Sequence, residues 1–322
     1  VKSHAVKDGF SYDVGFNLAF VGVGQAGGRI AAAFRALQYS RTCAINTDHT
    51  DLSSLPADMP QLDLRTGGAG KDPRRGAASI QGQEEAVYEL LTRAIGDSPD
   101  YLLVCAGLGG GTGSGAAPLI VDIARRYMTA NNRSSRRVGA IVTLPHPAEG
   151  QTPCRNAVQA FRAISLRAVT PLLVMDNERI SSLFTSGVSE FYNVANQQIA
   201  KLVHLFNRLS AQKSSIVTFD RADLANILDH GVCVLGASPI AKYESPADIS
   251  SAIREHLSDT ILASVDLRQG RTAGCVFVGG QEVLAQTPMS FFDGGFTMLT
   301  RLLADDSVVH RGIYSGARDG LN

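Results

Sequence analysis

The strongest constraint on the fold is a glycine-rich segment from Cys105 to Gly115, with the sequence CAGLGGGTGSG. An apolar run from Tyr101 to Cys105 precedes it and predicts a buried strand, and residues 116–128 follow with apolar side chains at helical spacing. A strand, a glycine loop and a helix in this order place backbone N–H groups and the positive end of a helix against an anion. Five glycines within seven residues also let a phosphate approach the main chain, and Thr112 and Ser114 can add hydroxyl donors.

A second glycine motif lies near the start of the chain. Residues 17–24 predict a buried strand that runs into the G-x-G-x-x-G spacing of dinucleotide-binding proteins, before a helix expected over 29–38. Asp48 lies near the place where a Rossmann enzyme carries an acidic residue, so an NAD-dependent Rossmann enzyme is one interpretation. The loop at 107–115 argues against it, because one pyrophosphate needs one glycine loop, whereas a triphosphate gripped from two sides uses two.

Composition limits the class of protein. A length of 322 residues exceeds what one hydrophobic core usually serves, so two domains are expected. With 44% hydrophobic and 19% charged residues the chain is typical of a folded protein, and 30 basic residues balance 30 acidic ones. No net field therefore favours direct binding of nucleic acid, and no apolar run is long enough for direct membrane insertion. The five cysteines form no C-x-x-C pair, which favours free thiols and a cytoplasmic protein.

The segment 109–115, GGGTGSG, resembles the phosphate-loop signature of the tubulin/FtsZ family. Other segments resemble further nucleotide loops of that family, in the same order along the chain. Residues 22–28 are similar to its first glycine loop, Asn46-Thr47-Asp48 to its N-T-D loop, and 67–73 to the loop that senses the γ-phosphate. The resemblance extends from about residue 17 to the end and is greater to prokaryotic FtsZ and CetZ proteins than to eukaryotic tubulins.

This resemblance implies GTP or GDP as the ligand, with Mg²⁺, and implies a set of binding residues. Glu149 is expected at the ribose hydroxyls, with Arg155 nearby although it lies two positions later than the FtsZ arginine. Asn177 and Asn196 are expected at the guanine edge, and Tyr192 is expected to stack on the base. Phosphate and ribose contacts are expected from Gly24, Gln25, Ala26, Gly27, Asn46, Asp48, Ala69, Gly70, Gly107, Gly109, Gly110, Gly111, Thr112, Gly113 and Ser114. No side chain is assigned as a metal ligand.

The segment 215–224, called the activation loop below, resembles a loop of FtsZ with the pattern N-x-D-F-A-D. Its acids are kept as Asp220 and Asp223, whereas Thr218 replaces the asparagine. In that family the loop acts on the nucleotide of the next subunit and polarises the attacking water, so these three are the expected catalytic residues. Two aspartates three apart at a helix start are also typical caps, and both roles can hold. Because Thr218 departs from the pattern, we expect hydrolysis but not necessarily a fast rate.

The expected fold is α/β. Residues 1–15 are expected to form an N-terminal extension, 16–187 a Rossmann-like parallel-sheet GTP-binding domain, 188–210 a long central helix, and 211–322 the activation loop with a smaller C-terminal α/β domain. The family's last strand would follow Gly320, so we expect a truncated end that omits any tail that recruits partners. Strands are expected at 17–24, 42–46, 101–105, 137–144, 170–175, 232–235, 274–278 and 308–313, and helices at 29–38, 75–95, 116–128, 188–209, 246–258 and 288–303.

The leading interpretation is a GTP-binding cytoskeletal protein that assembles head to tail with copies of itself and hydrolyses GTP at each subunit contact. A heterologous contact that does not close gives an open filament. Recruitment to a membrane would then need an adaptor, through a segment absent from this sequence. One alternative is a relative that binds GTP without assembling or hydrolysing it efficiently, which Thr218 keeps open. The NAD-dependent Rossmann enzyme is the other, and it is disfavoured.

Overall fold

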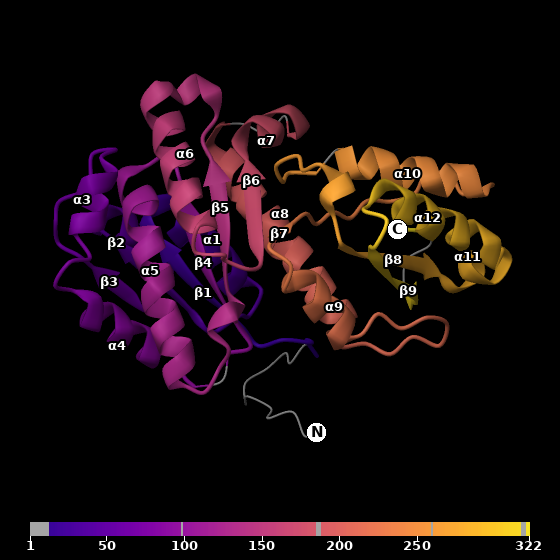
Figure 1. Ribbon diagram of the computed structural model, residues 1–322, viewed down its shortest axis with the longest axis horizontal. Coiled ribbons are helices and arrows are strands. Elements are labelled where there is room, and N and C mark those ends of the chain that lie inside the picture. Colours follow the sequence, from indigo (N-terminus) through magenta and orange to yellow (C-terminus); the bar gives the residue numbers. More distant parts are fainter. Residues whose placement is uncertain (1–12, 98, 185–187, 259, 317–319) are drawn as a thin grey trace.

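The computed structural model describes residues 13–97, 99–184, 188–258, 260–316 and 320–322, which form a large and a small sheet (Figure 1). The large sheet has seven strands, all parallel, in the order β3-β2-β1-β4-β5-β6-β7. The strands are β1 Leu18–Val23, β2 Thr42–Asn46, β3 Gln61–Asp63, β4 Tyr101–Gly107, β5 Val138–Leu144, β6 Leu172–Asp176 and β7 Val232–Cys233. The order steps outward on both sides of β1 and β4, so the switch point where such sheets bind ligands lies between these two strands.

Helices cover both faces of this sheet, as a parallel sheet with apolar strands requires. They and the helices of the smaller lobe are α1 Gly24–Ala36, α2 His49–Ser53, α3 Pro73–Ala78, α4 Glu84–Ile95, α5 Gly111–Ala130, α6 Gln151–Ser165, α7 Asn177–Leu183, α8 Val188–Leu209, α9 Arg221–Leu228, α10 Pro246–Ser258, α11 Gln281–Gln286 and α12 Met289–Leu302. None of the described helices is both long and apolar enough to cross a membrane.

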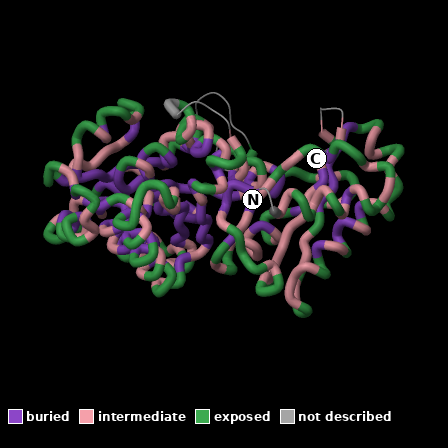
Figure 2. The backbone as a smooth tube through the Cα atoms, turned by 90° about the horizontal axis from the view of Figure 1, so that it is seen from above, coloured by how far each residue is buried: buried purple, intermediate pink, exposed green. Residues whose placement is uncertain are grey.

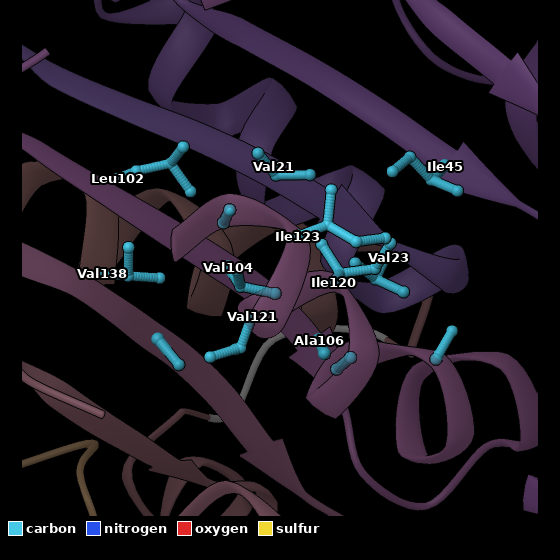
Figure 3. Packing of buried hydrophobic residues seen from close by; sticks show 14 of the residues in the cluster. Val21, Val23, Ile45, Leu102, Val104, Ala106, Ile120, Val121, Ile123 and Val138 are labelled. Carbon is cyan, nitrogen blue, oxygen red and sulfur yellow. The ribbon is translucent and has the colours of Figure 1, made fainter. Parts of the chain in front are cut away.

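The core divides into two layers because successive side chains of a strand point to opposite faces. Leu102, Val104 and Ala106 of β4 pack with apolar residues of α4, α5 and α6, as Figure 3 shows for α5. Leu103 and Cys105, between them in sequence, face α1 and α8 on the other side. In the tube view the buried segments run through the interior of the larger lobe (Figure 2). Both faces of the central strands are therefore buried from solvent, and these strands hold the loops at their ends in fixed positions.

A long helix, α8, leads from the large sheet toward a smaller lobe (Figure 1). In that lobe β8, Thr272–Gly280, pairs in parallel with β9, Val308–Gly316, and α11 and α12 lie between them in sequence. Ile249 of α10, Phe277 of β8, and Phe292 and Phe296 of α12 form its core. The smaller lobe also holds the segment after α8, because Val217 forms an antiparallel bridge with a residue of β9.

The expected α/β fold is confirmed, but two of the helices predicted from the sequence differ in their bounds. The single helix expected over 75–95 is divided into α3 and α4, because Gly82 between them has a left-handed φ of +78° that no helix accommodates. The helix expected from residue 116 begins at Gly111 instead, so residues 111–115 of the glycine segment belong to the helix. Residues 1–12 of the expected N-terminal extension, and the expected boundary at 187, lie outside the described residues.

Glycines at the start of α1 are required by close backbone packing, and this can be tested at Gly27. A Cβ there would lie 2.0 Å from the carbonyl oxygen of Cys105, a backbone atom that cannot rotate away. We expect Gly27→Ala to lower the free energy of unfolding by about 2 to 3 kcal/mol, measured by urea denaturation of the nucleotide-free protein.

Gly110→Ala is the matched control for this measurement. No described heavy atom lies within 4 Å of a Cβ built on Gly110, whose φ of −80° suits any residue. The control should change stability by less than about 0.5 kcal/mol. Equal effects of the two substitutions would contradict the packing argument.

Candidate functional site

The carboxyl ends of the central strands open into one pocket of about 420 Å³ beside the switch point of the large sheet. Its walls come from segments far apart in the sequence, among them the starts of α1, α5 and α7, the loop before α3 and one side of α8. The predicted residues that line it are Gly24, Gln25, Ala26, Asn46, Asp48, Ala69, Gly70, Gly107, Gly109, Gly110, Gly111, Thr112, Gly113, Glu149, Asn177, Tyr192 and Asn196.

Two long helices begin at one end of the pocket. Helix α1 starts at Gly24 and has 13 residues, and α5 starts at Gly111 and has 20. The described first turn of each helix contains no acidic residue. Helix N-termini expose N–H groups without intrahelical partners and carry a partial positive charge, and neither of these first turns has a carboxylate of its own. This end of the pocket is therefore suited to the phosphate groups of a ligand.

The two glycine loops at these helix starts pack directly against each other. Gly24 has a φ of +71°, and a Cβ there would lie 3.2 Å from the backbone nitrogen of Gly113. A Cβ on Gly113 would in turn lie 2.3 Å from the carbonyl oxygen of Gly107. Gly110 differs from these three, because its Cβ position is open. Some glycines thus bring the loops together, whereas Gly110 leaves the pocket accessible.

A polar network fixes the floor of this end of the pocket. The hydroxyls of Thr47 and Thr112 lie 2.6 Å apart, which joins the loop after β2 to the start of α5. The Asp51 carboxylate accepts hydrogen bonds from Gln25 Nε2 at 2.7 Å and from Asn46 Nδ2 at 3.0 Å. Thr47 and Asp51 also line the pocket, although neither is among the binding residues expected from the sequence. The one sequence signal for Asp51 was its position three residues after Asp48, the residue that caps α2.

The third glycine loop, before α3, is held in an unusual conformation. Gly68, Gly70 and Lys71 have φ values of +85°, +57° and +61°. The buried Asn156 of α6 donates to the carbonyl oxygens of Lys71 at 2.8 Å and Gly109 at 3.2 Å. This amide, which is also not among the residues expected from the sequence, joins the third loop to the glycine segment 109–115. Lys71 lines the pocket, where its ammonium can reach a phosphate.

The other end of the pocket has amide and aromatic side chains. Asn177, the first residue of α7, and Asn196 of α8 are buried and line the pocket, where their amides can both donate and accept. Tyr192, one turn before Asn196, is 46% exposed. Burial, and to a smaller degree the Glu149 carboxylate, raise the pKa of the Tyr192 phenol, while the Arg29 guanidinium lowers it. Arg29 also lines the pocket and was not assigned from the sequence.

Three residues assigned from the resemblance lie elsewhere in the described structure. Gly27 packs against the backbone of Cys105. The Ser114 hydroxyl donates to the carbonyl oxygen of Gly110 within α5. Arg155 is exposed on α6, and its neighbour on that helix provides the buried contact to the loops. None of the three lines the pocket.

The predicted catalytic residues lie at the start of α9, outside the pocket. One oxygen of Asp220 caps α9 by accepting two N–H groups of its first turn, at 2.7 and 3.0 Å. Asp223 Oδ2 accepts the Asp220 N–H at 2.9 Å, and Asp223 Oδ1 lies 2.6 Å from Nδ1 of His310. The Thr218 hydroxyl accepts the Ser214 N–H at 3.1 Å. The capping role that the sequence allowed for the two aspartates is therefore present.

A larger cavity, of about 660 Å³, lies between α8, α10 and the loop 236–242. None of the described residues that line it was assigned from the sequence, and none belongs to one of the three glycine loops. Its size alone does not make it the functional site, because the glycine loops and helix starts that suit a phosphate ligand line the smaller pocket.

Glycine loops at two helix starts, at the switch point of a parallel sheet, define this chain as an α/β nucleotide-binding protein. Comparison with protein families makes the assignment more specific. The family model described as Tubulin/FtsZ family, GTPase domain, matches residues 17–185. The chain belongs to the tubulin/FtsZ family.

Individual relatives agree with this assignment. Cell division protein FtsZ of Haloferax mediterranei is 26% identical over 279 residues, which cover 84% of this chain and 69% of the relative. Tubulin-like protein CetZ2 of Haloferax volcanii is 30% identical over 261 residues, 75% of this chain and 70% of the relative. The structure of a GTPγS-form protofilament of TubZ from Bacillus thuringiensis serovar israelensis shares the fold with a TM-score of 0.81, at 18% identity over 96% of this chain and 86% of that one.

The open position at Gly110 gives a test of the phosphate end. Gly110 lines the pocket, and a methyl group built there meets no described heavy atom within 4 Å. We expect Gly110→Ala to weaken GTP binding about tenfold or more, measured by titration calorimetry, because the methyl group occupies space close to the phosphates. Its stability without nucleotide should match that of the unsubstituted protein. Unchanged affinity would contradict the placement of the phosphates.

Proposed function

We propose that this chain binds GTP and GDP in the pocket, assembles head to tail with copies of itself, and hydrolyses GTP at the contact between subunits. The observation that carries the proposal is that two long helices, without acidic residues in their described first turns, begin at one end of the same pocket. The far end of this pocket is lined by buried amide side chains. Family membership over residues 17–185 supports the nucleotide class.

A magnesium ion fits this pocket as a companion of the phosphates. Mg²⁺ prefers oxygen ligands and is usually held by one or two carboxylates together with substrate phosphates. Both oxygens of Asp51 already accept hydrogen bonds, whereas Asp48 Oδ2 faces Gly68 at the phosphate end, so Asp48 is the carboxylate that would hold the ion. When bound, the ion would neutralise phosphate charge. The described residues include no cluster of three or more metal-binding side chains, so the nucleotide itself would supply most ligands.

The far end of the pocket would select guanine. A guanine edge presents both a donor group and an acceptor, which matches the two-sided hydrogen bonding of the Asn177 and Asn196 amides. Tyr192 lies one helical turn before Asn196, where its ring can stack on the base. Glu149 would accept hydrogen bonds from the ribose hydroxyls, since it lines the pocket together with Tyr192.

Replacement of Asn196 tests this base selection. We expect Asn196→Ala to weaken GTP binding about tenfold with little change in the weaker affinity for ATP, because one hydrogen bond to the guanine edge is lost. Competition against a fluorescent GTP analogue measures both affinities. Asn193→Ala, on the exposed side of the same helix, is the matched control and should leave both unchanged. A parallel loss for both nucleotides would contradict a role in base selection.

Hydrolysis would use Asp220 and Asp223 of the neighbouring subunit. Within one chain these carboxylates lie outside the pocket, so they could act only on a nucleotide bound by another copy. Phosphoryl transfer depends mainly on positioning and electrostatics, and a carboxylate that orients the attacking water is sufficient for the task. Thr218 would take the place of the family asparagine beside them.

Assembly into an open filament follows from a contact that joins different surfaces of the two copies. The pocket of one subunit would face the start of α9 in the next. The TubZ structure with the same fold was obtained as a protofilament, which supports this arrangement. We propose the division into residues 16–187, the central helix 188–210 and 211–322 as its functional units. We further propose that the protein is cytoplasmic and that its filaments would reach a membrane through an adaptor.

A protein that binds GTP without turning it over efficiently is the second candidate. The observation that favours it is at Thr218, which replaces the family asparagine and whose hydroxyl is bonded to Ser214. Family membership leaves the NAD-dependent enzyme without support.

Light scattering and phosphate release, followed in one sample with GTP, GDP or no nucleotide in Mg²⁺, test the leading proposal. We expect a GTP-specific rise in scattering that decays as phosphate appears. Asp223→Ala should lower turnover about a hundredfold or more and give polymers that persist, because the water loses its positioning carboxylate. Asp266→Ala, which removes an exposed carboxylate of the smaller lobe, is the control and should behave like the unsubstituted protein. Tight GTP binding without any rise would favour the second candidate.

A further inference from the structure

One face of strand β9 contacts the activation loop at three successive positions. His310, Gly312 and Tyr314 alternate along the strand and therefore point to the same side. A Cβ on Gly312 would lie 2.8 Å from Cβ of Phe219, so the absence of a side chain lets that ring approach the strand. The Tyr314 hydroxyl accepts the Phe219 N–H at 2.9 Å. The first of these positions, His310, meets the acid at the start of α9.

The imidazole of His310 is held at both nitrogens and is only 15% exposed. Nδ1 lies 2.6 Å from Asp223 Oδ1, and Nε2 lies 3.0 Å from Asn226 Nδ2. An amide nitrogen can only donate, so Nε2 accepts from Asn226 and the proton of the neutral ring is on Nδ1. His310 then donates a hydrogen bond to the Asp223 carboxylate.

This contact completes the fixation of the carboxylate. Asp223 Oδ2 already accepts the Asp220 N–H at 2.9 Å, so both oxygens are directed by neighbouring groups. A side chain that must orient a water molecule works best when its own position is set in advance by such supporting contacts. Because His310 belongs to β9, the smaller lobe sets the orientation of the acid.

We propose that His310 is a positioning residue for Asp223, which it holds in the orientation needed to act on the nucleotide of the next subunit. The inference rests on the proposed function for the action of Asp223, while the contact itself is a property of one chain. His310 touches neither the nucleotide nor the water.

Two substitutions of His310 separate its Nδ1 contact from its bulk. The amide nitrogen of asparagine can occupy the place of Nδ1 and donate to Asp223, whereas that of glutamine reaches the place of Nε2. We expect His310→Gln to lower turnover per assembled subunit about tenfold, the equivalent of one hydrogen bond to a charged group. His310→Asn should retain most of the turnover.

Binding and assembly are measured alongside, because a purely structural role would move them too. Both variants should keep the affinity for GTP and the critical concentration for assembly with GTPγS. Equal turnover in both variants and the unsubstituted protein would overturn the proposal. A loss of turnover that follows a loss of assembly in both variants would do the same.

Nitrogen-15 NMR of histidine-labelled protein tests the contact without reference to turnover. The seven histidines are separated by comparison with His310→Gln, which removes one set of signals. We expect the Nδ1–H tautomer for His310 and a shift of its Nδ1 resonance in Asp223→Ala. An Nε2–H tautomer, or signals unaffected by Asp223→Ala, would overturn the positioning contact. A protein that shows the contact but never hydrolyses GTP would instead contradict the proposed function.

Discussion

The structure depends on close approach between backbone segments that no side chain could tolerate. Glycine is needed where one element crosses the carbonyl groups of another, because a Cβ would lie far inside van der Waals contact. At four glycines, a Cβ would lie about 2 Å from the carbonyl oxygen of another residue. The distances are 2.0 Å from Gly27 to Cys105, 2.2 Å from Gly76 to Gly111, 2.3 Å from Gly113 to Gly107 and 1.9 Å from Gly115 to Pro73. These contacts draw α1, α3 and α5 onto the ends of β1 and β4, and so bring two helix starts to one pocket.

This packing gives the glycines of one motif different roles. Gly113 and Gly115 lie against backbone and contribute to the arrangement of the elements, whereas the Cβ position of Gly110 is open and leaves room for a ligand. A motif written as a run of glycines does not distinguish them, since the distinction depends on what crosses each position in three dimensions. Binding and stability are therefore separable within a few residues of the same loop.

The sequence predicted the large sheet well, because its central strands are continuous apolar runs with no solvent-exposed face. It also predicted most of the residues that line the pocket, through the resemblance of their loops. It missed α6, whose polar composition hides its buried side, and the turn at Gly82. Asp51 and Asn156 were missed because their roles come from contacts made after folding. Asn156 acts on a loop 85 residues away in sequence, and no local pattern records such a contact.

The activation loop shows how the smaller lobe would contribute to the chemistry proposed at the contact between subunits. Phe219 is buried, and a Cβ on either Gly274 of β8 or Gly312 of β9 would lie within 3 Å of its side chain. The aromatic ring thus anchors the loop in the smaller lobe, and the next residue, Asp220, begins α9 at the surface. A carboxylate that works across a subunit contact cannot be positioned by the pocket that it serves. Under the proposed function its orientation has to come from its own chain, in which His310 of β9 and the Asp220 N–H contact its two oxygens.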